Sequence, residues 1–432
     1  MRRLFKNATI LTMTGEEPLR NASLVVAGAE IFYVGTEPPE GRYDETVDLS
    51  GKLLMPGLIN THGHAAMCLL RGYGSDLPLQ TWLEEKMWPM EARFGAEQVR
   101  WGTALAVVEM LKGGTTLFAD MYDHMDEVAR VVEESGIRAS LCRGVIGLGP
   151  EEERREKLAE SVRFAEEWSG AADGRITTML GPHAPYTCPP DFLGEFVAAS
   201  ERTGAPVHIH LSETAFEVEQ NVRDYGARPV EHLDKLGLLD RPTLVAHAVH
   251  LTDAEIELLA ERDVKVSHNP GSNLKLGSGI ARVPEMLRAG MRPSLGTDSA
   301  ASNNNLDLLE EIRLAALIHK GNTLDPLAVS ASEALRMGTL YGAEAVFLAQ
   351  KVGTLEAGKL ADFIVLDLSA AHLQPQERIN DVISHVAYSA VHSDVLDVYV
   401  DGEPVVRDGV CTRLDEEKVV ARANEALAKI LG

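Results

Sequence analysis

The alternation of apolar and amphipathic segments through the middle of the chain constrains its fold most strongly. Eight apolar segments predict strands at 53–60, 115–121, 137–145, 176–183, 206–211, 243–250, 264–268 and 292–297. Helical periodicity appears between them, for example at 98–111, 151–168 and 253–261. Eight β/α units are the count of a closed parallel barrel of roughly 250 residues. We therefore predict an α/β protein whose residues 56–354 form a (β/α)₈ TIM-type barrel.

The two ends of the chain differ from this middle part. Strand-like runs fill the N-terminal segment at 8–13, 23–26, 31–35 and 46–49, and Gly28 lies where a hairpin can turn. The C-terminal segment has a strand-like run at 361–367, and strand-like residues flank Asp401-Gly402 as in a hairpin. These patterns predict one small β-sandwich domain formed by both termini, from residues 1–55 and 355–432.

Charge and cysteine content exclude several functional classes. The 432-residue chain has a formal net charge of −24, which disfavours binding to nucleic acid or to an anionic membrane through a basic face. The four cysteines form no Cys-x-x-Cys pair, which suits the reducing cytoplasm. No long apolar segment follows the N-terminus, so we expect a cytoplasmic protein without a signal peptide or membrane span. A homo-oligomer remains open.

Histidines gather at the ends of the predicted strands. Eight of the fourteen lie at or just past these ends: His62, His64, His183, His208, His210, His247, His250 and His268. In a parallel barrel the strand ends meet at one mouth, where the active site lies. His62 and His64 are two residues apart on a strand, so both side chains leave the same face. Two neutral imidazoles that converge in this way make half of a transition-metal site.

Other polar residues at these ends complete a candidate catalytic centre. Three imidazoles and the carboxylate of Asp298 suit a divalent metal such as Zn²⁺, which lowers the pKa of bound water to about 7. Glu213 can move protons, and His247 can orient the water. Structural alternatives exist for single residues, since Asp298 can be a helix N-cap and His247 a buried structural histidine. Spacing alone does not distinguish His208 from His210 as a ligand.

These motifs resemble the amidohydrolase superfamily over nearly the whole chain. The matching features are Pro-Gly-Leu-Ile-Asn-Thr-His-Gly-His at 56–64, His210, His247, Asp298, and Gly-Thr-Leu-Glu-Ala-Gly-Lys-Leu-Ala-Asp at 353–362. The resemblance implies that the metal ligands are His62, His64, His210 and Asp298. Binuclear members add a carboxylated lysine, often at the end of strand four, and segment 176–183 has no lysine. The resemblance therefore implies one divalent metal per chain, with Zn²⁺ favoured and Fe²⁺ as the alternative.

Two further features narrow the resemblance to a deaminase branch. His210 is followed by Glu213, and segments 67–83 and 87–91 are similar to the methylthioadenosine/S-adenosylhomocysteine deaminases, apart from Ser75-Asp76 where many relatives have two acids. This implies hydrolytic deamination of an adenosine-type nucleoside to an inosine-type product and ammonia. An activated hydroxide attacks C6, Glu213 protonates N1, and Asp298 takes the proton of the water.

The resemblance also implies contacts to the nucleoside. Glu91 binds the ribose hydroxyls, His183 contacts the nucleoside, and Arg143 pairs with a substrate carboxylate such as that of homocysteine. Structural alternatives are a solvated Glu91, a loop-capping His183 and a bridge from Arg143 to a local acid. We expect Arg154 and Arg155 to lie on a solvated helix face.

Several questions about function remain open from the sequence. The 5′ substituent of the substrate can be methylthio, homocysteinyl, hydroxyl or hydrogen. The alternative functions are guanine, pterin or triazine hydrolysis, or a non-catalytic scaffold.

Overall fold

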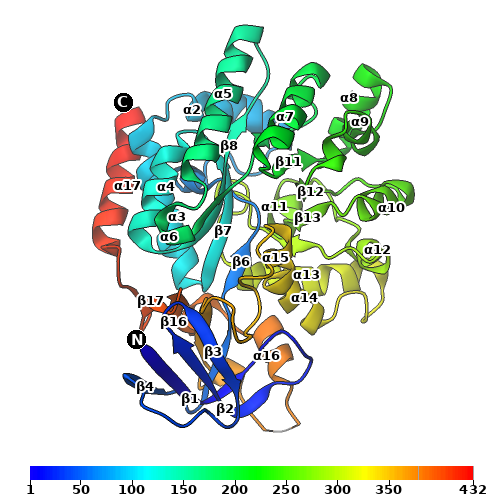
Figure 1. Ribbon diagram of the computed structural model, residues 1–432. Helices are drawn as coiled ribbons and strands as arrows, with labels where there is room; N and C mark the ends of the chain where they lie inside the picture. The colour runs from blue at the N-terminus through cyan, green and yellow to red at the C-terminus, as the bar shows by residue number, and fades with distance from the viewer. Residues whose placement is uncertain (378, 432) are drawn as a thin grey trace.

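The computed structural model describes residues 1–377 and 379–431 and contains three β-sheets (Figure 1). The largest is formed by nine strands from both ends of the chain: β1 (Arg2–Ile10), β2 (Leu19–Ala27), β3 (Glu30–Gly35), β4 (Glu45–Asp48), β5 (Lys52–Pro56), β15 (Phe363–Asp367), β16 (Val395–Val400), β17 (Glu403–Arg407) and β18 (Val410–Cys411). Their order is β18-β17-β16-β15-β5-β1-β2-β3, and β4 pairs with β1. Figure 1 shows the blue N-terminal strands beside the orange-red C-terminal ones.

The core of this sheet joins residues from both termini. The ring of Phe5 on β1 packs edge-on against Phe363 on β15 and Tyr399 on β16, with ring centroids 5.1 and 5.2 Å apart. The predicted hairpin is confirmed, because β16 and β17 pair antiparallel around Asp401 and Gly402, which both have positive φ. The aromatic contacts explain why segments so distant in sequence share one sheet.

The middle of the chain supplies two parallel sheets. One contains β6 (Leu58–Asn60), β7 (Thr115–Tyr122), β8 (Arg138–Val145), β9 (Ile176–Thr178) and β10 (Gly181–Pro182); the other contains β11 (Val207–Leu211), β12 (Thr243–His247), β13 (Lys265–His268) and β14 (Ser294–Leu295). Backbone hydrogen bonds also cross between the two sheets. His208 N–H donates to Leu180 O (2.8 Å), and Thr61 N–H donates to Leu295 O (2.9 Å). The sheets are therefore neighbours along both of their edges.

Helices surround these parallel strands (Figure 1). The longer ones are α3 (Ala96–Lys112), α4 (Met125–Ser135), α5 (Glu151–Trp168), α7 (Pro190–Thr203), α8 (Ala215–Tyr225), α10 (Asp253–Glu261), α13 (Leu308–Thr323) and α17 (Glu416–Leu431). Shorter ones include α9 (Pro229–Lys235), α11 (Pro270–Lys275), α12 (Val283–Arg288), α14 (Ala331–Met337), α15 (Leu340–Ala345) and α16 (Val382–Tyr388). The helices predicted at 151–168 and 253–261 are confirmed, and a capping box of Thr252 and Glu255 begins α10. Among the described residues, none of the helices combines the length and apolarity that a membrane crossing requires.

One predicted strand belongs to two different sheets. Residues 53–60 were expected to form a single strand, but β5 ends at Pro56 in the nine-stranded sheet and β6 begins at Leu58 in a parallel sheet. Gly57 separates them, and a Cβ at this position would lie 2.0 Å from Thr116 Oγ1. Only glycine fits where the chain passes between the sheets at such a close approach.

Three other predicted strands are shorter than expected. The strand predicted at 176–183 is interrupted between β9 and β10, that predicted at 292–297 is reduced to β14, and that predicted at 243–250 ends at His247. At the second site, Thr297 N–H donates to the side chain of Asn60 (3.0 Å), so a side chain replaces the strand partner. The chain then turns at Asp298, whose φ is 59°.

A buried ion pair links the nine-stranded sheet to the parallel strands. Arg138 at the start of β8 is 2.8 Å from Asp362, just before β15, and 2.5 Å from Asp401 in the β16–β17 turn. The side chains of Arg138 and Asp362 are only 3% and 2% exposed. Helix α17 lies along α3, and the Gln98 side chain donates to Ala426 O (3.0 Å).

Candidate active site

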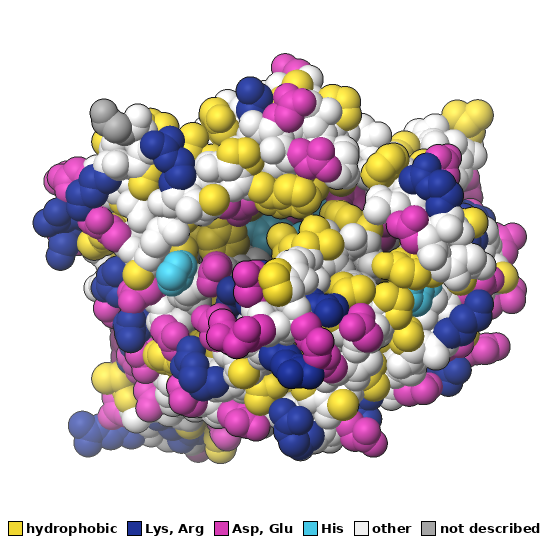
Figure 2. Space-filling view, turned by 90° about the horizontal axis from the view of Figure 1, so that it is seen from above, with side chains coloured by type: hydrophobic (Ala, Val, Ile, Leu, Met, Phe, Trp, Pro, Cys, Tyr) yellow, Lys and Arg dark blue, Asp and Glu magenta, His cyan; other side chains and the backbone are white. Residues whose placement is uncertain are grey.

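A cavity of about 510 Å³ opens where the parallel strands β6, β7, β8, β10, β11 and β12 end. From above, Figure 2 shows a hollow near the middle of this face, bordered by hydrophobic side chains, with histidine at its bottom. His64, His210, Glu213, His247 and Asp298 all line the cavity. The structure thus brings together residues from strands that are far apart in the sequence.

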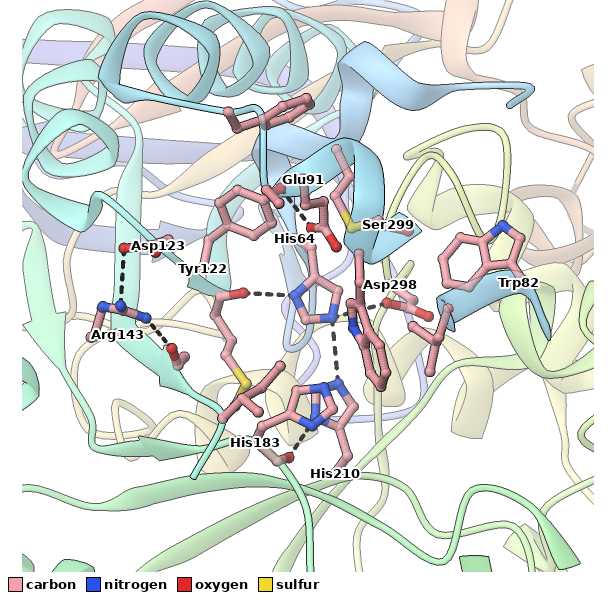
Figure 3. A pocket seen from close by; sticks show the side chains of 18 of the residues that line it. His64, Trp82, Glu91, Tyr122, Asp123, Arg143, His183, His210, Asp298 and Ser299 are labelled. Carbon is pink, nitrogen blue, oxygen red and sulfur yellow. Dashed lines mark hydrogen bonds and ion pairs between the residues drawn. The ribbon is translucent and has the colours of Figure 1, made fainter. Parts of the chain in front are cut away.

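Hydrogen bonds to the backbone fix the orientation of two histidines. His64 Nδ1 lies 2.6 Å from Met121 O, and His210 Nδ1 lies 2.8 Å from His183 O. Because a carbonyl only accepts, each Nδ1 carries the proton and each Nε2 offers a lone pair. These two Nε2 atoms are 3.4 Å apart (Figure 3). Such second partners orient histidines that bind metals.

His62 is oriented by another histidine. His208 Nδ1 donates to Leu244 O (3.0 Å), so its Nε2 accepts from His62 Nδ1 at 2.8 Å. His62 Nε2 is buried and has no hydrogen-bond partner in the protein. Sequence spacing left His208 and His210 as equal alternatives. In the structure the Nε2 of His210 joins those of His62 and His64, whereas His208 lies behind His62.

The carboxylate of Asp298 completes this cluster. Its Oδ1 is 3.4 Å from His64 Nε2 and 3.6 Å from His62 Nε2. The ligand atoms of His62, His64 and His210 all lie within 4.8 Å of one another, as do those of His62, His247 and Asp298. The unpartnered His62 Nε2 is the kind of buried polar atom that a cation satisfies. The donor set therefore fits a divalent metal.

Burial sets the protonation of the histidine cluster. Loss of solvent lowers the pKa of His62 and His210 well below the ordinary value, and the neighbouring histidines lower it further. Both rings are therefore neutral at physiological pH. Neutral imidazole is the form that binds a metal.

Glu213 and His247 form a second pair at the cavity wall. Their Oε2 and Nε2 atoms are 3.9 Å apart. Burial raises the pKa of the Glu213 carboxyl. For His247, burial lowers the pKa, but the charges of Glu213 and Asp298 outweigh this effect, so the pKa of His247 is raised overall. His247 Nδ1 faces the side-chain oxygen of Asn273 at 2.8 Å, which turns its Nε2 towards Glu213.

Glu217 supports this pair and was missed in the sequence. Its buried carboxylate accepts from the N–H groups of Ser212 (2.8 Å) and Glu213 (2.7 Å). It thereby fixes the turn between β11 and α8, where Ser212 has a φ of 50°. The pattern Thr214-x-x-Glu217 at the start of α8 is a helix-capping signal that could have identified it.

Glu91 faces the cavity from helix α2 (Trp88–Glu91). The hydroxyl of Tyr122 donates to its Oε1 at 2.7 Å, and burial raises the pKa of the carboxyl (Figure 3). The sequence pattern gave no role to Tyr122, although its position at the end of β7 is a signal. His183 lines the same cavity, and burial lowers its pKa to about 3, so its ring is neutral. Its Nδ1 lies 2.9 Å from Thr187 Oγ1.

Arg143 lines the cavity but is already paired with acids. Its guanidinium lies 3.1 Å from Asp123 and 3.2 Å from Glu160, so the bridge to local acids is present. The expected solvated face is right for Arg155, whose side chain is 69% exposed. It is wrong for Arg154, which is 16% exposed because it packs over the ring of Phe192 on α7.

Comparison with known proteins agrees with this geometry. Residues 53–405 match the model of the amidohydrolase family, and the chain belongs to that family. The 5-methylthioadenosine/S-adenosylhomocysteine deaminase of Pelotomaculum thermopropionicum is 48% identical over 99% of this chain and 98% of its own. The 5′-deoxyadenosine deaminase of Methanosarcina barkeri is also 48% identical, over 99% of this chain and 98% of its own. The resemblance inferred from the sequence is thereby confirmed.

A solved structure extends the comparison to the whole fold. An adenosine deaminase from Xanthomonas campestris with bound zinc has a TM-score of 0.92 and 36% identity, covering 99% of this chain and 98% of its own. The amidohydrolase fold is thus shared along the full chain, with its mixed α/β content.

Proposed function

We propose that this chain catalyses hydrolytic deamination of adenosine-type nucleosides with one divalent metal per chain. The main support for this proposal is that Glu213, a buried carboxyl with a raised pKa, lies in the same cavity as the cluster of His62, His64, His210 and Asp298. Full-length relatives named as deaminases of this substrate class support the proposal. The candidate substrates are 5′-methylthioadenosine, S-adenosylhomocysteine, adenosine and 5′-deoxyadenosine.

Zinc is the proposed metal, and Fe²⁺ is the alternative. Three imidazole nitrogens and one carboxylate oxygen make a ligand set that suits Zn²⁺. The zinc-bound structure of a similar adenosine deaminase supports this choice. A metal held there would supply hydroxide at neutral pH, because coordination lowers the pKa of water to about 7.

The cavity residues have distinct proposed roles in the reaction. Glu213, a buried carboxyl whose pKa is raised, donates a proton to ring nitrogen N1, and Asp298 accepts the proton of the water. His247, whose Nε2 lies 3.9 Å from Glu213 Oε2, orients the water. Water adds at C6, the proton held by Asp298 passes to the exocyclic nitrogen, the bond between C6 and that nitrogen breaks, and ammonia leaves. The remaining hydroxyl proton on the C6 oxygen returns to Glu213. The water oxygen stays on C6 of the inosine-type product.

Three other residues are proposed to hold the substrate. Glu91 accepts from the ribose 2′- and 3′-hydroxyls, and its orientation is supported by Tyr122. His183 contacts the nucleoside as a neutral ring. Arg143 binds a carboxylate on the 5′ substituent, with its guanidinium oriented by Asp123 and Glu160.

The fold around the site is proposed to be a closed (β/α)₈ barrel over residues 56–354. The hydrogen bonds that cross both edges of the parallel sheets support closure. Residues 1–55 and 355–432 are proposed to form the small domain, with its nine-stranded sheet folded as a β-sandwich. We also propose a cytoplasmic location and leave the oligomeric state open.

A steady-state comparison of substrates tests the proposed function. Ammonia release is measured with adenosine, 5′-deoxyadenosine, 5′-methylthioadenosine and S-adenosylhomocysteine, and with adenine and guanine as controls. A chlorotriazine is a further control, for which chloride release is measured. At least one adenosine derivative should exceed every control by 10²-fold or more, because a buried carboxylate without its hydroxyl partners costs a few kcal/mol. Faster turnover of guanine or the triazine would overturn the nucleoside assignment.

Arg143→Ala tests the proposed contact to the 5′ substituent. The substitution should impair S-adenosylhomocysteine more than 5′-methylthioadenosine, because only the first has a carboxylate for the guanidinium. The measurement is kcat/KM for both substrates. An equal loss on both would assign Arg143 to the ion pairs with Asp123 and Glu160 alone.

A further inference from the structure

We propose that Ser272 and Ser302 fix Asp298 so that only its Oδ1 reaches the metal. The inference rests on the proposed metal site and concerns residues that the proposed reaction does not use. Both serines act through Asp298 and are therefore positioning residues. Asp298 would then bind the metal through a single oxygen.

Two hydroxyl groups meet on the same carboxylate oxygen. Ser272 Oγ donates to Asp298 Oδ2 at 2.6 Å, and Ser302 Oγ donates to the same atom at 2.8 Å. Ser302 also has Ser299 O within 3.2 Å, but the anionic oxygen is the stronger acceptor. All three side chains of this contact are buried. Oδ2 thus accepts both serine hydrogen bonds, while Oδ1 faces His62 and His64.

The two serines come from different segments of the chain. Ser272 lies in α11, which follows β13, and Ser302 lies in the turn after β14. A carboxylate held from two sides cannot rotate without breaking at least one charge-assisted hydrogen bond. The left-handed φ of 59° at Asp298 fixes the backbone end of the same side chain.

A buried glutamate ties these two segments together. Glu311 on α13 accepts from Gly271 N–H (2.9 Å) through one oxygen and from the Asn303 side chain (2.8 Å) through the other. Gly271 and Asn303 are the chain neighbours of Ser272 and Ser302. A Cβ at Gly271 would lie 2.3 Å from Glu311 Oε1, so a side chain at this position would displace the Glu311 carboxylate. Glu311 therefore sets the spacing between the two serines.

Metal affinity measures this arrangement without using activity. Ser272→Ala, Ser302→Ala and the double variant are stripped of metal, and their dissociation constants for Zn²⁺ are determined by competition with a chromogenic chelator. Loss of a partner that orients a metal ligand costs about 10 to 100-fold in affinity. We expect this loss in the double variant and a smaller loss in each single variant.

The absorption spectrum of the Co²⁺-substituted protein gives a second readout. Visible bands of Co²⁺ depend on the number and geometry of its ligands, so a carboxylate freed to use both oxygens should change them. The matched control is Ser294→Ala, because Ser294 is buried beside the same strands but donates to Val266 O (2.9 Å), not to Asp298. We expect wild-type affinity and spectrum in this control.

Each outcome decides one question. Unchanged Zn²⁺ affinity and an unchanged Co²⁺ spectrum in the serine variants would overturn the inference, and so would an equal loss in Ser294→Ala. A wild-type protein that binds no divalent metal would instead overturn the proposed function. If the double variant does not fold, the two single variants decide, because each keeps one donor to Asp298.

Discussion

Burial determines what the Glu213 carboxyl can do. Loss of solvent raises the pKa of the Glu213 carboxyl, which favours the protonated form that can give a proton to a ring nitrogen. The two N–H groups held by Glu217 fix the backbone from which Glu213 extends. Position and protonation thus come from different neighbours, and each can be changed separately.

Glu213→Gln should retain the metal and lose turnover. The amide has nearly the same shape but cannot transfer a proton, and positioned acid–base groups contribute about 10² to 10⁴-fold. Steady-state kinetics and metal analysis of the purified variant measure both effects. Glu219→Gln, at an exposed position on α8, is the control and should be unaffected. Near-normal rates in Glu213→Gln would contradict the proton-transfer role.

Tyr122→Phe should weaken recognition of the ribose. It removes the donor that fixes Glu91, and a hydrogen bond to a charged group contributes about 1.5–3 kcal/mol, or roughly tenfold or more. KM should rise for adenosine derivatives but stay constant for 2′,3′-dideoxyadenosine, which lacks the hydroxyls. Tyr73→Phe, at an exposed position, serves as the control. The same rise with the dideoxy substrate would assign Tyr122 to packing.

The metal cluster joins strands that are not consecutive in the chain. Its residues come from the segments after β6 and β14 and from β11, so no single strand–helix unit contains the whole site. A bound metal stabilises the folded chain because the unfolded chain lacks the converged ligands. The site and the fold are therefore coupled.

Removal of the metal should lower the thermal stability. At a metal concentration 100 times the dissociation constant, binding contributes about 2.7 kcal/mol. Thermal unfolding is followed for the metal-loaded protein, the chelator-treated protein, and the treated protein after Zn²⁺ or Mg²⁺ is added. Zn²⁺ should restore the midpoint and Mg²⁺ should not, because Mg²⁺ prefers oxygen ligands. Identical midpoints with and without chelator would contradict the metal assignment.

Much of this arrangement could be predicted from the sequence, but orientation could not. Period-two spacing predicted that His62 and His64 converge, although β6 ends at Asn60 and both lie just past it, and apolar segments located most strands. The same spacing could not tell whether His208 or His210 is the metal ligand. That difference depends on hydrogen bonds to Leu244 and His183, which lie elsewhere in the chain. Local patterns do not contain such long-range partners.

The boundary between the two sheets also could not be predicted from the local sequence pattern. Residues 53–60 read as one apolar strand because both halves are buried, although they belong to different sheets. The break at Gly57 follows from the approach of Thr116, which no local signal indicates. Tyr122 and Glu217 were missed for a related reason. Each acts by orienting another residue, and the local sequence does not show that contact.

One buried charge cluster connects the terminal sheet to the parallel strands. Arg138, Asp362 and Asp401 come from three separate parts of the chain. Buried charges need their partners, because an unpaired ion in the interior is costly. The cluster therefore makes the two parts of the molecule depend on each other.

Arg138→Ala should destabilise the protein strongly. Removing one partner of a buried ion pair costs about 3–5 kcal/mol, because the remaining carboxylates lose their counter-charge. The free energy of unfolding is measured by urea titration. The control is Lys429→Ala, which breaks an exposed pair with Glu97 whose side chains are 57% and 42% exposed and should cost about 0–1 kcal/mol. Equal effects of the two substitutions would contradict the buried cluster's role.

The position of strand β5 has a consequence during synthesis of the chain on the ribosome. It pairs with β1 on one side and with β15 on the other, and β15 begins only at Phe363. A ribosome that adds about 5–20 residues per second takes on the order of tens of seconds to pass from one to the other. During that interval the nascent protein exposes one open edge of β5, the kind of edge that other chains can join.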